Sequence, residues 1–139
     1  MPRSADDVSA NLELIRSATE ALNAHDLDAC VGYIAPDFII HLAELPQPLY
    51  GRETWRQNAE VMQLAFPDLA ARIDGIVAAG DEVALRLTLT GTHAGEFLGR
   101  PATGRTVRYV SHEFYRIADG LIAEEWICSD TFSLLQQVS

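Results

Sequence analysis

The feature that most constrains the fold of this chain is the stretch from Arg105 to Asp130. Two runs rich in β-branched and aromatic residues flank a short turn there, and the turn contains Asp119-Gly120. An Asp-Gly pair readily takes the positive φ angles that a tight hairpin needs. We therefore predict a long antiparallel hairpin whose turn lies at residues 118–120.

One face of this predicted hairpin combines apolar side chains with two carboxylic acids, because alternate residues of a strand share a face. That face carries Tyr109, Ser111, Glu113, Tyr115, Leu121, Ala123, Glu125 and Ile127. If it points inward, the hairpin carries two carboxyl groups into an apolar cavity. The alternative is the opposite parity, or a bulge that rotates one of them outward, and both would then be surface charges.

Length and charge narrow the class of protein. A chain of 139 residues, 48% of them apolar, fits one globular domain spanning residues 1–139. Its 20 acidic and 10 basic side chains give a net charge of -10, which repels phosphate groups and anionic lipid, so we expect no nucleic-acid and no membrane partner. The N-terminus has no stretch like a signal peptide, and we expect a cytoplasmic protein. Cys30 and Cys128 are expected as two reduced core thiols, and a disulfide between them is the alternative.

The N-terminal half of the chain predicts helices. Ser4 and Asp7 have the spacing of a capping box, and apolar residues follow at helical spacing as far as Leu22. Asp26 is a candidate N-cap for a shorter second helix that Pro36 ends. Further elements are a strand over 38–42, a strand stub near 49–51, a third helix over 52–66, a hairpin over 69–90, a glycine-rich loop over 92–104 and a helical tail.

This order predicts an α+β domain in which helices cover one side of a curved antiparallel sheet. A strongly twisted sheet that is closed on one face by helices makes a cone. An unfilled cone is a pocket.

Four passages of the sequence resemble the nuclear-transport-factor-2-like superfamily, and in particular its SnoaL-like branch of polyketide and ester cyclases. They are Pro36-Asp37-Phe38, Phe66-Pro67-Asp68-Leu69, Gly91-Thr92-His93-Ala94-Gly95-Glu96-Phe97 with its continuation to Gly104, and Arg116-Ile117-Ala118-Asp119-Gly120 with Ile122, Glu124, Trp126, Asp130 and Leu134-Leu135-Gln136-Gln137. Together these passages span nearly the whole chain and stand in the order of the family.

The resemblance implies a cone-shaped, strongly curved antiparallel sheet covered on its concave side by three N-terminal helices. It also implies a hydrophobic polycyclic or terpenoid substrate, no metal or organic cofactor, and an acidic residue that gives and takes protons. The sequence itself contains no zinc-ligand spacing and no phosphate-binding glycine loop before a helix.

The chain departs from the family at one important position. In the aldol-condensing cyclases of this branch, the essential Asp follows the position of Trp126, and here that residue is Ile127. Glu113 and Glu125 stand where those cyclases often carry pocket histidines. The resemblance therefore predicts the fold and the pocket better than the reaction.

Glu113 and Glu125 are the main candidate catalytic residues. A turn near 118–120 predicts that they pair directly across the two strands, with Cβ atoms roughly 4.5–5.5 Å apart. Two carboxyl groups that close do not both ionise cheaply in an apolar cavity. We therefore predict one shared proton, with one acid and one base, able to protonate a carbonyl or epoxide oxygen and remove a proton elsewhere.

Three further residues are candidates with alternative structural roles. His41 is predicted to assist catalysis as a base or donor, or else to be a hydrogen-bonded packing residue. His93 contacts substrate at the cavity mouth or anchors the glycine-rich loop. Asp130 belongs to the catalytic set or caps the final helix.

The predicted substrate-binding wall consists of apolar and amphipathic residues. Its members are Tyr33, Trp55, Met62, His93, Tyr109, Ser111 and Ile127. The opposite sheet face is predicted to carry Val110, His112, Phe114, Ile122 and Trp126, which is too apolar for a single domain to leave wet. We therefore expect a homodimer through the open sheet face.

These residues and the resemblance together predict a cofactor-independent cyclase or isomerase of hydrophobic polyketide-like molecules. Two alternatives remain open. One is a different reaction in the same pocket, such as epoxide opening, hydration or a hydroxylation-related step. The other is a small-molecule-binding protein without turnover.

Overall fold

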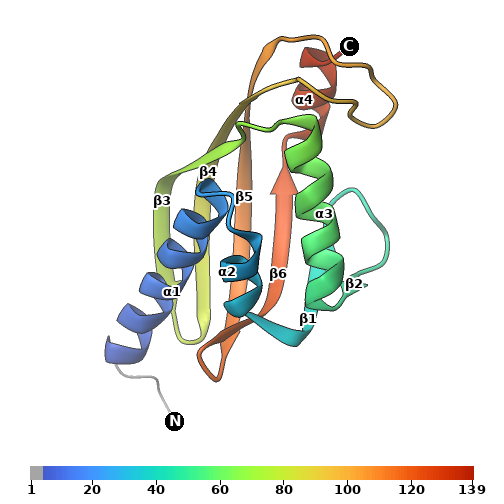
Figure 1. The fold of residues 1–139 in the computed structure, drawn as a ribbon. Helices are drawn as coiled ribbons and strands as arrows, with labels where there is room; N and C mark the ends of the chain where they lie inside the picture. Colours follow the sequence, from blue (N-terminus) through green and yellow to red (C-terminus); the bar gives the residue numbers. More distant parts are fainter. Residues whose placement is uncertain (1–4) are drawn as a thin grey trace.

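The computed structural model describes residues 5–139, and a six-stranded sheet forms its centre (Figure 1). The elements in chain order are α1 (Ala5–Asn23), α2 (Leu27–Gly32), β1 (Ile34–Leu42), β2 (Leu49–Tyr50), α3 (Arg52–Ala65), β3 (Ala70–Ala79), β4 (Glu82–Thr92), β5 (Thr106–Ala118), β6 (Leu121–Ser129) and α4 (Thr131–Gln137). The predicted α+β order is confirmed. The capping box at Ser4 lies outside the described residues.

The sheet is curved and unclosed, with the strand order β2-β1-β6-β5-β4-β3. Neighbouring strands are antiparallel except β1 and β6, which run parallel. The prediction of a wholly antiparallel sheet is therefore wrong at this pair. No hairpin joins β1 to β6, so their relative direction is not fixed by a tight turn as it is for β3–β4 and β5–β6.

The long C-terminal hairpin forms with the predicted turn. Asp119 and Gly120 have φ angles of 53° and 74°, the positive values that the Asp-Gly pair was expected to supply. Along β5 the residues from Thr106 to Phe114 alternate strictly between exposed and buried side chains. This alternation places the odd-numbered residues of that stretch on the concave face.

A bulge changes the parity of β6 near the turn. The pairing of β5 with β6 shifts between Arg116 and Ile117, and Ile122 becomes a buried core residue, 4% exposed. Leu121 and Ala123 instead line a small hollow beside Arg116, away from the main cavity. The predicted positions of these three β6 residues are therefore wrong, because an unpaired residue exchanges the two faces of a strand.

The helices α1, α2 and α3 lie on one side of the sheet, where they cover its concave face (Figure 1). Asp26 caps α2 as predicted, since its carboxylate accepts a hydrogen bond from the backbone N–H of Ala29 at 3.1 Å. The second helix ends earlier than expected, because β1 already begins at Ile34. No helix among residues 5–139 combines the length and apolar character needed to cross a membrane.

The loop over residues 93–105 folds back onto the end of α3. The backbone N–H groups of Ala94 and Gly95 both donate to the carbonyl oxygen of Ala65, at 3.0 and 3.1 Å. The ring of Phe97 packs on Phe66 with centroids 5.3 Å apart. The loop is thereby fixed over one end of the space between the helices and the sheet.

Only one of the two cysteines is a core thiol. Cys30 is buried, and burial together with the charge of Asp26 raises the pKa of its thiol to about 11. Cys128 is exposed on the outer face of β6, so the prediction of two core thiols is wrong for this residue.

Candidate active site

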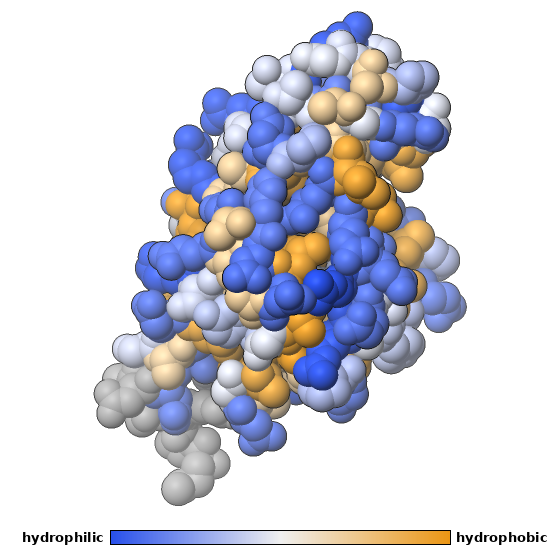
Figure 2. Space-filling model, in the orientation of Figure 1, coloured by the Kyte–Doolittle hydropathy of each residue, from blue (hydrophilic) through white to orange (hydrophobic). Residues whose placement is uncertain are grey.

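The helices and the concave face of the sheet enclose a cavity of about 400 Å³. Its wall is mostly apolar and includes Ile15 and Leu22 of α1, Trp55 and Met62 of α3, and Leu87 of β4. Figure 2 shows apolar atoms between the hydrophilic outer surfaces of the helices on this side of the molecule. A cavity of this size and character suits a largely apolar small molecule.

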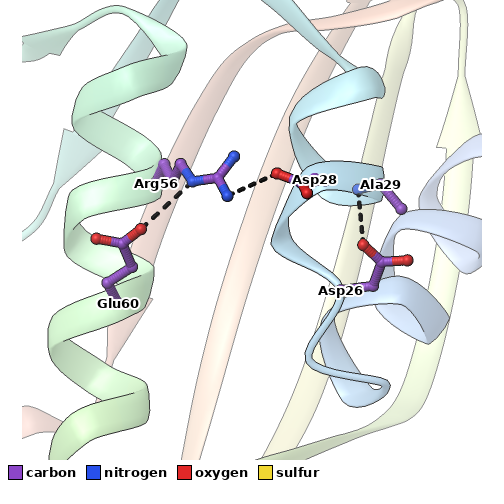
Figure 3. Close-up of polar contacts among 5 residues, drawn as sticks. All are labelled: Asp26, Asp28, Ala29, Arg56 and Glu60. Carbon is purple, nitrogen blue, oxygen red and sulfur yellow. Dashed lines mark hydrogen bonds and ion pairs between the residues drawn. The ribbon is translucent and has the colours of Figure 1, made fainter.

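An ion pair links two of the helices that form the cavity wall. Arg56 of α3 reaches across to Asp28 of α2, with Nη2 and Oδ1 2.6 Å apart, and also lies 3.3 Å from Glu60 one turn further along α3 (Figure 3). Asp28 is largely exposed. Such an exposed pair orients the two helices but contributes little to the free energy of folding.

Two carboxyl groups enter this apolar wall from the long hairpin. Glu113 of β5 and Glu125 of β6 are 8% and 4% exposed, and both line the cavity. The predicted direct pairing is wrong by two residues, because Glu113 lies opposite Ile127 and Glu125 lies opposite Tyr115. The two acids are therefore diagonal neighbours on the same face, close enough for the charge of Glu113 to act on Glu125.

Hydroxyl groups surround Glu113. The phenol of Tyr115 donates to Glu113 Oε1 at 2.5 Å, and the hydroxyl of Ser111 donates to Oε2 at 2.7 Å. The hydroxyl oxygens of Ser111 and Ser129 lie 2.9 Å apart. Both oxygens of the Glu113 carboxylate are thus held by hydroxyl donors.

The environment favours the neutral form of Glu125. Burial raises the pKa of its carboxyl group well above the usual range, and the charge of Glu113 raises it further, which together outweigh the lowering effect of the Tyr115 hydroxyl. Among the described residues that line the cavity there is no arginine, lysine or histidine to offset two negative charges. The cavity therefore disfavours the charged form of Glu125.

The family model of the SnoaL-like polyketide cyclases matches residues 12–138, which is nearly the whole chain. The chain belongs to this family. Solved structures that are similar to this chain share the fold described above.

Individual relatives of this family cover most of the chain. The curated protein DauD, an aklanonic acid methyl ester cyclase of Streptomyces sp. (strain C5), is 29% identical over 119 residues, which cover 84% of this chain and 74% of DauD. The crystal structure of wild-type IdmH from Streptomyces antibioticus, a proposed polyketide cyclase, is 38% identical with a TM-score of 0.81 and covers 91% of this chain and 96% of that one. AclR from Streptomyces galilaeus, a proposed hydroxylase, is 30% identical with a TM-score of 0.87 and covers 94% and 96% of the two chains.

Several residues of the predicted substrate-binding wall reach the cavity of this SnoaL-like protein. Trp55, Met62, Tyr109 and Ile127 line it directly. Ser111 is fully buried behind the wall, where it bonds to Glu113. Tyr33 packs against the core without lining the cavity, so its predicted contact with substrate is not supported.

His41 does not reach the cavity, and its predicted catalytic role is wrong on position. Its Nε2 lies 2.6 Å from Glu124 Oε2, and its ring stacks on Trp126 at 5.1 Å on the outer face of the sheet. Burial would raise the pKa of Glu124, but the hydrogen bonds from His41 and Arg116 outweigh it and lower the pKa. The parity of β1 explains the error, because the neighbouring Ile40 is the inward residue.

His93 and Asp130 have the structural roles that were predicted as alternatives to a role in the site. His93 is fully buried outside the cavity wall, and its Nδ1 accepts a hydrogen bond from the backbone N–H of Thr103 at 3.2 Å, so it anchors the loop. Asp130 accepts a hydrogen bond from the backbone N–H of Ser133 at 3.1 Å and caps α4. Neither residue lines the cavity.

The sequence reasoning missed the connected roles of Tyr115 and Ser129. Tyr115 was expected only as part of an inward face, yet its phenol donates to Glu113 and it lies opposite Glu125 in the strand register. Ser129 lines the cavity and continues the parity of Glu125 and Ile127, which was the signal that could have identified it. Among residues 5–139, no three His, Cys, Asp or Glu side chains are grouped as a metal site would need.

Gly95 allows the loop to lie against α3, and its replacement by alanine should destabilise the protein. An added Cβ would lie 2.2 Å from the carbonyl oxygen of Leu64, so the backbone must shift. We expect Gly95→Ala to lower the free energy of unfolding by about 1–3 kcal/mol in urea titrations. Gly32→Ala is the matched control, because a Cβ there meets no atom within 4 Å. Equal stabilities of the two variants would contradict this account of the loop.

Proposed function

We propose that this protein is a cofactor-independent general acid–base cyclase or isomerase of a hydrophobic, polyketide-like small molecule. The observation that carries the proposal is the pair of buried acids, Glu113 and Glu125, in an apolar cavity without a cation among its described lining residues. Such a pair supplies a proton donor and a proton acceptor at one place and at one pH.

The chemistry requires only proton transfers and one new carbon–carbon bond. The ionised acid removes a proton from a carbon beside a carbonyl group, which generates an enolate. The enolate carbon attacks a second carbonyl carbon of the same molecule, and the neutral acid protonates the oxygen of that carbonyl as the ring closes. One proton enters the pair and one leaves it, so the pair ends the reaction with the protonation sites exchanged.

The charge of the cavity favours a neutral ligand. Glu44 lines the same cavity as Glu113 and Glu125, and none of the described lining residues is basic. A carboxylate ligand would add a further negative charge to an apolar space, which is costly. We therefore propose that the substrate is an ester or another uncharged polycyclic compound and not a free acid.

Aklanonic acid methyl ester, the compound in the name of the relative DauD, is a suitable first substrate. Incubation with the purified protein should give a product of unchanged mass, or of mass reduced by one water, with the chromatographic behaviour of a closed ring. The free acid should react much more slowly. Failure of both compounds to bind or react would count against this substrate class.

A hydroxylation-related reaction is a second candidate function. Ile127 stands where the aldol-condensing members carry their essential Asp, and the similar AclR is a proposed hydroxylase. The same incubation separates the two candidates, because hydroxylation gives a product heavier by one oxygen atom. A binding protein without turnover would retain the ligand unchanged.

We propose in addition that two copies associate through the open sheet face. Val110 and Phe114 are 46% and 52% exposed on β5 of this face. Arg86 and Arg108 are also exposed there and offset part of the net charge of -10 that would separate two copies. A two-fold axis would bring the apolar strip of one copy onto that of the other.

Phe114→Glu should convert the dimer to a monomer, because it places two negative charges in the centre of the contact. Sedimentation equilibrium at micromolar concentration measures the mass directly. Phe132→Glu is the control, since Phe132 is 73% exposed but lies on α4 and not on the sheet. A monomeric wild-type protein, or a dimer that survives the Phe114 change, would refute the proposed interface.

A further inference from the structure

The hydrogen bonds around Glu113 have a fixed direction, which follows from counting hydrogen atoms. A hydroxyl group has one hydrogen to donate and can accept two bonds. Ser111 gives its hydrogen to Glu113 at 2.7 Å, so in the 2.9 Å contact between the serines Ser129 must be the donor. Tyr115 gives its hydrogen to the other oxygen of Glu113 at 2.5 Å. Every donor in this series of hydrogen bonds therefore points toward Glu113.

Tyr115 stands between the two acids. It lies opposite Glu125 in the strand register and two residues from Glu113 on the same strand and face. Its hydroxyl interacts with both carboxyl groups. Because Tyr115 gives its one hydrogen to Glu113, its phenol oxygen remains available as an acceptor. A neutral Glu125 can therefore donate its own hydrogen to this oxygen or to Glu113.

We propose that Tyr115 is a positioning residue that assigns the roles in the pair, holding Glu113 as the ionised base and leaving the proton on Glu125 as the acid. This inference rests on the proposed acid–base function and deepens it. Without a donor such as Tyr115, two similar acids would share the proton, and either could meet the substrate in the wrong state. Ser111 supports the assignment from the other oxygen of Glu113.

Three further titratable groups line the cavity beside this pair and Tyr115. They are Cys30 of α2, Glu44 from the segment after β1, and Tyr109 of β5. Burial holds the pKa of Cys30 and of Tyr109 above the usual ranges, so both stay neutral near pH 7. The described parts of α1 and α3 that line the cavity contribute no charged side chain. Glu44 is therefore the remaining charge whose titration must be separated from that of the pair.

The test is a pH titration of the carboxyl groups in the whole protein without substrate. The titration is observed by ¹³C NMR of labelled glutamate side chains. Glu113→Gln, Glu125→Gln and Glu44→Gln assign the three signals. In Tyr115→Phe the carboxylate of Glu113 loses one hydrogen-bond donor, so the titration of the pair should move to higher pH. The acidic limb of the pH–rate profile should move by the same amount once a substrate is in hand.

Two further variants sharpen the result. Tyr109→Phe makes the same chemical change on the same strand and in the same cavity, but Tyr109 makes no hydrogen bond to either acid among the described contacts, so the titration should not move. Replacing Tyr115 by 3,5-difluorotyrosine keeps the ring and strengthens the donor, so the shift should reverse in sign. This variant also serves if Tyr115→Phe does not fold.

The outcomes distinguish this inference from the proposed function. If the Tyr115 variants lower stability or turnover without moving the titration, the residue has a packing role only and the inference is wrong. If the titration moves but neither glutamine substitution in the pair affects turnover, the inference about the acids holds and the acid–base function fails.

Discussion

Replacing either Glu113 or Glu125 by glutamine should lower turnover by about 10²- to 10⁴-fold, the usual contribution of a positioned acid or base. Glutamine keeps the size and polarity of the side chain but neither gives nor takes a proton at neutral pH. Affinity for the ligand should therefore stay within a few-fold of the wild type. Steady-state kinetics and a direct binding titration on the same preparations separate the two effects.

The adjacent Glu124 provides the matched control for this experiment. It lies on the outer face of β6, bound to His41 at 2.6 Å and to Arg116 at 3.0 Å. Glu124→Gln makes the same chemical change one residue away and should leave turnover unchanged. Comparable losses in all three variants, or no loss in the two cavity variants, would rule out the acid–base mechanism.

Glu125→Gln should also stabilise the protein at neutral and mildly alkaline pH. The folded-state pKa of Glu125 is raised above its ordinary value of 4.5, mainly by burial and then by the charge of Glu113. The folded protein therefore holds a proton that the unfolded chain releases. The contribution of Glu125 to stability is therefore fully present below pH 4.5 and is lost as the pH rises toward the folded-state pKa, at about 1.4 kcal/mol for each pH unit.

Urea unfolding at pH values from 5 to 8, about one unit apart, tests this prediction. The quantity compared is the free energy of unfolding of the variant minus that of the wild type. The stability gained by Glu125→Gln should grow with pH. In Glu124→Gln the sign is reversed: hydrogen bonds from His41 and Arg116 outweigh burial and lower the pKa of Glu124, so the wild type loses this contribution as the pH falls. A Glu125→Gln difference that does not change with pH would show that this acid is not held neutral by the fold.

Much of the fold was predictable because local signals agreed with it. The Asp119-Gly120 turn, the cap at Asp26 and the change of apolar period after Pro67 each identify an element or its boundary. The long alternation along β5 set the inward face that carries Glu113. These features depend on neighbouring residues, which is the information that a single sequence contains.

The errors arose where distant segments or irregular pairing decide the outcome. The register of β5 against β6 differs by two residues from the simple count across the turn, and a bulge near Arg116 moves Ile122 inward. The parallel contact of β1 with β6 and the outward position of His41 depend on a pairing between strands far apart in the chain. None of these is encoded in a local period, so the position of Glu125 could be predicted but its partner Tyr115 could not.

The neighbouring acids Glu124 and Glu125 have unequal environments only because successive side chains of β6 point to opposite faces. One inserted or deleted residue between the bulge and Ile127 would exchange them, placing the arginine-bound carboxylate in the apolar hollow and the proton-holding one in water. Length changes in this strand are therefore far more damaging than equal changes at the tip of the 93–105 loop. Divergence of this scaffold is expected to proceed by substitution along β6 and by insertion elsewhere.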